Sequence, residues 1–151
     1  MSEDNSQAIL SAACLQLGML GARITQTFST RIERIGLTHK QVGLLAVVDG
    51  GLAHSQREIA ARLEVAPSLV VSLVDQLIEL GAVKRERSTS DRRVQNIVLT
   101  DLGRDLLAAS ANVAAELDGE FRANLSDSGQ TALDTLLAEL ETGSPTLLPS
   151  T

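Results

Sequence analysis

The chain has 151 residues, of which 44% are hydrophobic and only 1% aromatic, so a core has to be built from Leu, Ile, Val and Ala. No apolar run reaches the length of a membrane span, the N-terminus lacks a signal-peptide pattern, and the single cysteine, Cys14, excludes an intrachain disulfide or a cysteine zinc cluster. We therefore expect a cytoplasmic protein with no membrane partner, cofactor or metal, and the formal charge of −6 argues against a general nucleic-acid binder.

The N-terminal region is predicted to form one long helix. Residues 1–7 are polar, and we expect them to be frayed. From Ala8 to Arg34, apolar residues recur at three- and four-residue steps, which indicates an amphipathic helix. The stripe consists of Leu17, Leu20, Ile24, Phe28, Ile32 and Ile35. Gly36 is predicted to end the helix.

Two capping boxes mark the next helices. Thr38 and Gln41 form the first, which begins a helix that ends before a Gly-Gly pair. Ser55 and Glu58 form the second, which begins a short helix over residues 56–63.

A further helix is predicted from Pro67 to Leu80, because proline suits the first helical position and Gly81 suits the end. One face buries Val70, Leu73, Val74 and Leu77. Together with the short helix three residues before it, this segment is typical of a helix–turn–helix. The side chains that face away from the buried stripe are those of Ser68, Leu69, Ser72 and Gln76.

A β-hairpin is predicted next, from the strand-like runs Val83–Arg87 and Val94–Leu99. The polar loop between them carries Asp91, Arg92 and Arg93. Two arginines at the tip of a hairpin give a cationic finger about the right size to enter a DNA groove.

The distribution of charge supports this interpretation in spite of the acidic total. Residues 84–93 contain five basic and two acidic side chains, whereas residues 105–151 contain one basic and eight acidic ones. Because a phosphate responds to charges within a Debye length of roughly 8–10 Å, the local field of the hairpin matters more than the net charge.

Two more helices are predicted after the hairpin. The first runs from Leu102 to Asn124, following a cap at Thr100, and Ser126 can cap the second. Their stripes are Leu102, Leu106, Val113, Leu117 and Phe121 in the first, and Leu133, Leu136, Leu137 and Leu140 in the second. A flexible tail with Gly143, Pro145 and Pro149 closes the chain.

The predicted fold is mainly α with a small β-hairpin wing, a winged helix–turn–helix flanked by N- and C-terminal dimerisation helices. Residues 1–36 and 101–151 contain more apolar side chains than packing against one small lobe can bury. The simplest way to bury the rest is contact with a second copy of the chain. We therefore predict a homodimer in which these two regions form the interface and residues 37–100 form the DNA-binding domain.

The sequence resembles the MarR family of transcriptional regulators over roughly Leu37 to Gly103. The matching segments are Asp91-Arg92-Arg93, Ile97-Val98-Leu99-Thr100-Asp101-Leu102-Gly103, Leu37-Thr38, Ser55-Gln56-Arg57-Glu58-Ile59-Ala60 and Leu73-Val74-Asp75-Gln76-Leu77 with Gly81. The resemblance implies a homodimer that places its recognition helix in a major groove and its wing in the adjacent minor groove of a pseudo-palindromic operator. It also implies modulation by a small anionic or phenolic effector, or by cysteine oxidation.

This resemblance implies that Arg92 and Arg93 contact the minor groove or its phosphates, with Asp91 pairing with an arginine to hold the wing. The alternative is a solvated turn with a weak surface ion pair. On the recognition helix, Ser72 and Gln76 can bond to base edges or phosphates and Leu69 can contact a thymine methyl, whereas the alternative is a helix that is merely polar outside. Ser68 shares that exposed face.

Three further arginines are candidates for phosphate contact. Arg57 lies in the first turn of the helix that precedes the recognition helix. In this family that position is near the DNA backbone. Arg85 and Arg87 share one face of a strand, opposite Lys84. The family often has an arginine or lysine where this chain has Ser72, so base readout here leans more on the wing and on DNA shape.

Cys14 lies where organic-hydroperoxide sensors of the family place a reactive cysteine. Those sensors hold the thiolate with tyrosines, and Phe28 and His39 stand about where the tyrosines would be. His39 can polarise a thiol, whereas the alternative is a small apolar residue on a helix. The effector candidates are Arg23, Phe28 and His39, in a cleft between dimer lobe and winged helix. His54 and His39 lack neighbours at zinc spacing, which favours capping or surface roles.

The sequence therefore predicts a sequence-specific DNA-binding regulator that acts as a repressor under a small-molecule effector. The alternatives are an oxidant sensor that uses Cys14 and a winged-helix module that binds protein, which the acidic balance and the neutral recognition helix motivate. An enzyme is not expected, because the chain lacks a Gly-rich phosphate loop, a nucleophile elbow and a paired histidine site.

Overall fold

The computed structural model describes residues 2–143, without the side chains of residues 2 and 3. The elements in chain order are α1 (Ser2–Ser11), α2 (Ala13–Glu33), α3 (His39–Asp49), α4 (Gln56–Leu63), α5 (Pro67–Leu80), β1 (Val83–Arg87), β2 (Gln95–Leu99), α6 (Asp101–Ala123) and α7 (Asp127–Gly143). The predicted fold class is confirmed. The flexible tail predicted around Pro145 and Pro149 lies outside the described residues, and Gly143 belongs to α7.

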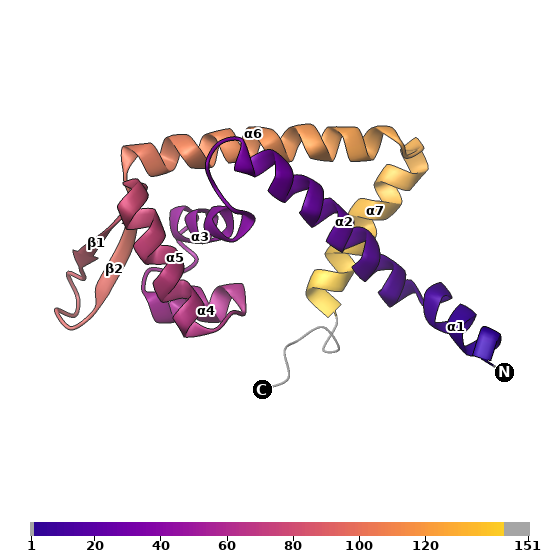
Figure 1. The fold of residues 1–151 in the computed structure, drawn as a ribbon, viewed down its shortest axis with the longest axis horizontal. Helices are drawn as coiled ribbons and strands as arrows, with labels where there is room; N and C mark the ends of the chain where they lie inside the picture. Colours follow the sequence, from indigo (N-terminus) through magenta and orange to yellow (C-terminus); the bar gives the residue numbers. More distant parts are fainter. Residues whose placement is uncertain (1, 144–151) are drawn as a thin grey trace.

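The helix–turn–helix and the wing form a lobe at one end of the long helix α6, and α1, α2 and α7 lie toward the other end (Figure 1). Strands β1 and β2 pair antiparallel, with Val83 opposite Leu99 and Arg87 opposite Gln95. Strand β2 begins one residue later than predicted. The Ile97 N–H donates to the His54 carbonyl at 2.7 Å, so the segment before α4 lies along β2.

The capping residues act largely as predicted. Thr38 and Gln41 form a complete capping box on α3. Ser55 Oγ accepts from the Glu58 N–H at 3.2 Å, and Glu58 Oε2 accepts from the His54 N–H at 2.8 Å. This backbone bond lowers the pKa of the Glu58 carboxyl below its ordinary value of 4.5.

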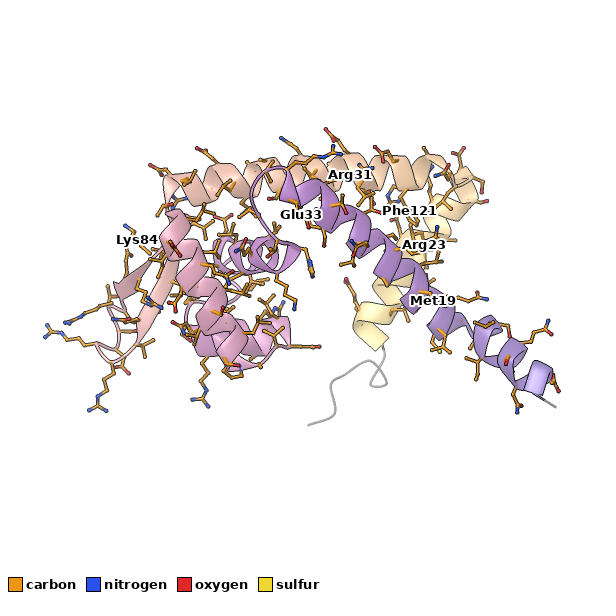
Figure 2. All side chains as sticks on the ribbon, viewed as in Figure 1. Met19, Arg23, Arg31, Glu33, Lys84 and Phe121 are labelled. Atoms are coloured by element: carbon orange, nitrogen blue, oxygen red, sulfur yellow. The ribbon has the colours of Figure 1, made fainter. Side chains whose placement is uncertain are left out.

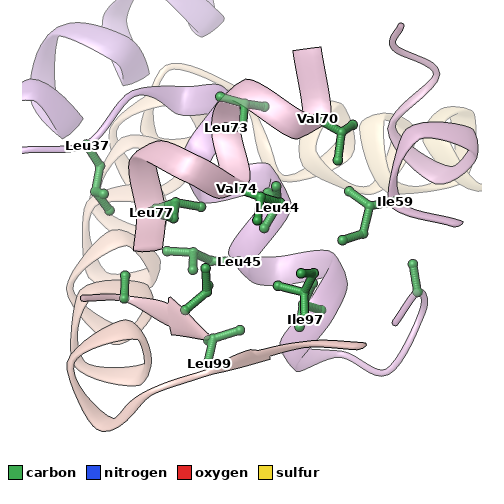
Figure 3. Close-up of a cluster of buried hydrophobic side chains, with 14 of the residues drawn as sticks. Leu37, Leu44, Leu45, Ile59, Val70, Leu73, Val74, Leu77, Ile97 and Leu99 are labelled. Carbon is green, nitrogen blue, oxygen red and sulfur yellow. The ribbon is translucent and has the colours of Figure 1, made fainter. Parts of the chain in front are cut away.

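A single apolar core fills the winged lobe (Figure 3). Its buried members come from the end of α2, from α3, α4 and α5, from both strands and from the loops before α3, α4 and β1: Ile32, Leu37, Leu44, Leu45, Val48, Ala53, Ile59, Ala60, Val70, Leu73, Val74, Leu77, Ala82, Val83, Ile97 and Leu99. Leu106, Leu107 and Val113 of α6 pack against it. The flanking helices therefore take part in the core of the winged lobe.

The N-terminal helix predicted as continuous is broken at Ala12, which has extended backbone angles of φ −63° and ψ 123°. Helices α1 and α2 meet there at 63°. Side chains next to the break satisfy carbonyls at the end of α1: Ser11 Oγ donates to the Ala8 carbonyl at 3.2 Å, and Gln16 Nε2 donates to the Leu10 carbonyl at 3.1 Å. The region predicted to be frayed is helical from Ser2.

The stripe predicted on α6 is wrong at Leu102, which is 45% exposed. The buried positions on this helix are Gly103 and Ser110. Ser110 Oγ donates to the Leu106 carbonyl at 2.8 Å, which satisfies the buried hydroxyl.

The helices outside the winged lobe leave apolar side chains uncovered in a single chain. The exposed ones are Ile9, Leu10, Leu15, Leu17, Met19, Leu20, Ile24, Leu136 and Leu137. No single helix among the described residues is long and apolar enough to cross a bilayer, and only the bent pair of α1 and α2 passes that test jointly, on length and composition.

Candidate nucleic-acid interface and ligand cavity

The wing loop has a fixed backbone and free cationic side chains. Asp91 Oδ1 accepts from the Arg93 backbone N–H at 3.0 Å, and the Val94 N–H donates to the Asp91 carbonyl at 3.0 Å. The expected pairing of Asp91 with an arginine side chain is therefore corrected, because the carboxylate bonds to backbone. Within residues 2–143, the exposed guanidinium groups of Arg92 and Arg93 make no ion pair.

The exposed face of α5 differs from its prediction at two positions. Ser68 and Ser72 are exposed, as expected. Leu69 is half-buried and packs against the core, so its side chain is less available to a thymine methyl than predicted. The Gln76 amide is engaged at both ends, because its oxygen accepts from Gln41 Nε2 at 2.9 Å and its nitrogen donates to Ser72 Oγ at 3.3 Å.

The arginines on and beside strand β1 fall into two groups. Arg85 Nη2 bonds to Asp75 Oδ1 at 2.9 Å and to Gln56 Oε1 at 3.3 Å, and so ties β1 to α5 and α4. Asp75 thereby neutralises a cation predicted to face phosphate. Arg57 and Arg87 are exposed without an ion pair inside the described chain. All three lie on the winged lobe, as the prediction required.

Three backbone segments meet closely around Thr100 at the base of the wing. The sequence alone did not identify this junction. Thr100 Oγ1 donates to the Gly81 carbonyl at 2.5 Å and accepts from the Gly103 N–H at 3.1 Å. The Thr100 N–H donates to the Ala82 carbonyl at 3.0 Å. The end of α5, the end of β2 and the start of α6 therefore meet at one point. The signal was the Leu-Thr-Asp-Leu-Gly motif, whose Gly103 leaves no room for a Cβ.

A cavity of about 610 Å³ lies between the winged lobe and the flanking helices. Its walls are mostly apolar: Ile24, Thr25, Phe28, Val42, Gly43, Ala46, Ala114, Leu117, Phe121, Leu133 and Leu137, together with His39, Asp118 and Arg122. His39 Nδ1 is 2.8 Å from Ser29 Oγ, which fixes the ring on its wall. Phe28 and His39 both line this cavity, and their role in effector binding stays a prediction.

Arg122 is the cation of this cavity, and sequence reasoning missed it. Its Nε donates to Asp118 Oδ2 at 2.9 Å and its Nη2 donates to Asp134 Oδ1 at 2.7 Å. The bond with Asp134, and then that with Asp118, raise the pKa of the guanidinium above its ordinary value. The ion pair with Asp134 links α6 to α7, so Arg122 both holds these helices together and places a positive charge at the cavity.

Arg23 is not in that cavity. It lines an adjoining hollow of about 340 Å³, with Leu20, Ile24, Thr27, Arg31, Leu117, Glu120, Phe121 and Asn124, of which Ile24, Leu117 and Phe121 also line the first cavity. There Arg31 of α2 donates to Glu120 of α6, from Nη2 to Oε2 at 2.5 Å and from Nη1 to Oε1 at 3.2 Å. Figure 2 labels Arg31 on α2. Arg23 and His39 therefore line adjoining hollows, and their contact with one effector stays a prediction.

Cys14 is exposed at the start of α2. His39 contacts Ser29, which lies on α2 fifteen residues after Cys14. At 1.5 Å per residue this separates Ser29 from Cys14 by about 22 Å. His39 of the same chain therefore lies too far away to polarise this thiol. The residues that the structure describes contain no group of three or more His, Cys, Asp and Glu side chains suited to a metal ion.

Sequence comparisons relate the chain to known regulators. The sequence profile of the MarR family matches residues 35–94. A Thauera aromatica protein named for regulation of the hcr operon is 33% identical over 105 residues, which are 70% of this chain and 63% of that protein. The HTH-type transcriptional repressor MdtR of Bacillus subtilis is 32% identical over 99 residues, 66% of this chain and 64% of that protein. The chain thus spans slightly less than two thirds of the length of these curated relatives.

A solved structure covers nearly the whole fold. CouR from Rhodococcus jostii RHA1, in a crystal structure bound to p-coumaroyl-CoA, superposes with a TM-score of 0.76 over 95% of this chain and 99% of that one, at 25% identity. The helices on both sides of the winged lobe therefore belong to the shared architecture.

Proposed function

Because the chain belongs to the MarR family, we propose that it is a cytoplasmic DNA-binding transcriptional regulator and not an enzyme. In this proposal it acts as a repressor and binds a pseudo-palindromic operator as a homodimer. The observation that carries the proposal is the wing tip. Arg92 and Arg93 extend from a loop whose backbone Asp91 and Ser88 hold, and neither guanidinium is neutralised within the described chain. Placing two exposed, unpaired cations against phosphates is favourable because it releases counterions from the DNA, whereas Arg85 is already paired with Asp75.

The uncovered apolar residues support the homodimer. Nine of the exposed large apolar side chains lie on α1, α2 and α7, and Figure 1 shows these helices toward the end of α6 that is opposite the wing. A second copy buries such a surface by two-fold symmetry, and the same symmetry presents two recognition helices to the two half-sites of an operator.

DNA binding is tested by fluorescence anisotropy with a labelled duplex from upstream of the protein's own gene. We expect two chains per duplex and an affinity that falls steeply with salt, with a slope of about −0.9 for each phosphate contacted. A salt-independent affinity, or binding no tighter than to random DNA, would contradict the proposal and favour the alternative of a protein-binding module.

We also propose that the 610 Å³ cavity takes the effector, a small phenolic compound with a largely apolar body. Apolar walls, with the polar ring of His39 at one side and the Arg122 pair at another, suit an aromatic body that carries few polar groups. Because Asp118 and Asp134 already occupy Arg122, a phenol fits better than a strong acid. CouR, bound to p-coumaroyl-CoA, provides a phenolic precedent.

Replacing Ala114 with Trp should fill part of the cavity and weaken binding of 4-ethylphenol, an uncharged phenol, at least tenfold in calorimetric titrations. The matched control is Ala115→Trp, an exposed neighbour on α6 that does not line the cavity. Equal binding by both variants would place the ligand elsewhere.

Oxidant sensing by Cys14 is supported less well than effector binding. The thiol is exposed, lies outside the cavity and has no histidine of its own chain nearby. If peroxide releases the protein from DNA, the Cys14→Ser variant decides whether this thiol is the sensor.

A further inference from the structure

A chain of hydrogen bonds crosses from the first turn of α3 to the exposed face of α5. The Thr38 backbone N–H donates to Gln41 Oε1 at 3.0 Å, and Gln41 Nε2 donates to Gln76 Oε1 at 2.9 Å. Gln76 Nε2 then donates to Ser72 Oγ at 3.3 Å. The chain therefore ends at a hydroxyl on the predicted DNA-contacting face.

The direction of every bond in this chain is fixed by its first member. A backbone N–H can only donate, so the Gln41 amide must turn its oxygen toward Thr38 and its nitrogen toward Gln76. Gln76 must then present its oxygen to Gln41, because the other orientation would set two NH₂ groups against each other. Gln41 is only 9% exposed, so water does not readily replace its partner.

We propose that this chain orients the Ser72 hydroxyl as a hydrogen-bond donor to DNA. Ser72 Oγ accepts from Gln76, and its own hydrogen has no acceptor among the residues that the structure describes. The hydroxyl hydrogen therefore points away from the amide, toward solvent or a ligand. Ser68, one turn earlier and equally exposed, makes no such bond within residues 2–143, so its hydroxyl rotates freely.

A fixed donor selects acceptor atoms. In DNA these are phosphate oxygens, the N7 atoms of guanine and adenine, O6 of guanine and O4 of thymine, whereas an amino group of cytosine or adenine could bond only to the one lone pair of Oγ that Gln76 leaves free. The inference rests on the proposed DNA binding and adds to it a chemical rule for one position of the recognition helix. Gln76 and Gln41 are positioning residues in this scheme, not contacts.

The test is a double-mutant cycle on a duplex that the wild-type protein enriches from a random-sequence library. Ser72→Ala is measured in the wild-type background and in Gln76→Glu. In the latter, one carboxylate oxygen accepts from Gln41 and the other accepts the Ser72 hydrogen, which reverses the last bond. Because Ser72→Ala is compared within each background, the repulsion between the new charge and DNA cancels.

We expect Ser72→Ala to weaken binding about tenfold for a dimer with two such contacts in the wild-type background, and less than twofold in Gln76→Glu. Gln76→Leu is the control background, since leucine offers the hydroxyl no acceptor and the effect of Ser72→Ala should persist there. Thermal unfolding checks that all variants fold. Replacing single phosphates by methylphosphonates, or purines by 7-deazapurines, identifies whether the acceptor is backbone or base.

Two results would overturn the inference while DNA binding stands: an equal effect of Ser72→Ala in the wild-type and Gln76→Glu backgrounds, or no effect in the wild type. Failure of the wild type to enrich any duplex would instead remove the proposed function itself, and the inference with it.

Discussion

Arg92→Ala/Arg93→Ala should abolish most of the protein's affinity for its operator. A dimer carries four of these unpaired guanidinium groups, and each one that meets a phosphate adds favourable counterion release, which the alanine variant forgoes. We expect binding to weaken by about 3 kcal/mol or more, over a hundredfold, and the slope of log affinity against log salt to become shallower by up to about 3.6. Anisotropy titrations at several salt concentrations measure both quantities.

The control for charge is Arg34→Ala/Arg104→Ala, which removes the same charge from residues that lie on neither α5 nor the hairpin. Arg104 pairs with Asp101 at 3.2 Å and both its side chain and that of Arg34 are exposed. A comparable weakening in the two double variants would show a non-specific response to net charge. Full binding by the wing variant would move the essential contacts to α5.

Gly103→Ala should destabilise the fold by about 3 kcal/mol or more. A Cβ at this position would overlap the Ala82 carbonyl oxygen and lie 3.0 Å from its carbon. Both are backbone atoms at the junction where Thr100 holds the end of α5 against α6, so neither can move aside as a flexible side chain does. Urea unfolding followed by circular dichroism measures the change in free energy.

Gly119→Ala on the same helix is the matched control. Nothing lies within 4 Å of its added Cβ, and glycine inside a helix is about 0.5–1 kcal/mol less favourable than alanine. This variant should be neutral or slightly more stable than the wild type. If Gly103→Ala changed the free energy of unfolding as little as Gly119→Ala, the backbone around Gly103 would accommodate a Cβ, which its geometry argues against.

Opposite behaviour of two glycines in one helix illustrates how far sequence alone reaches. Both lie inside the helix predicted from Leu102 to Asn124, and helix propensity treats them alike. Only the approach of Ala82, 21 positions away in sequence, separates them.

The sequence by itself determined the winged helix–turn–helix and its family. The caps at Thr38, Ser55 and Thr100 and the proline at the start of α5 act within a few positions, so their structural outcome can be read from residues that lie close together. The cationic tip of the wing is equally local, because a hairpin loop projects whatever residues it contains.

The tertiary structure alone decided which side chains are free to act. It pairs Arg85 with Asp75 and Gln76 with Gln41, and it places Arg23 and His39 in different hollows. These outcomes depend on how helices and strands distant in sequence are packed, which periodicity does not encode. A polar residue on an exposed face is available to a ligand only if no neighbouring element has already satisfied its hydrogen bonds, and that depends on three-dimensional contacts.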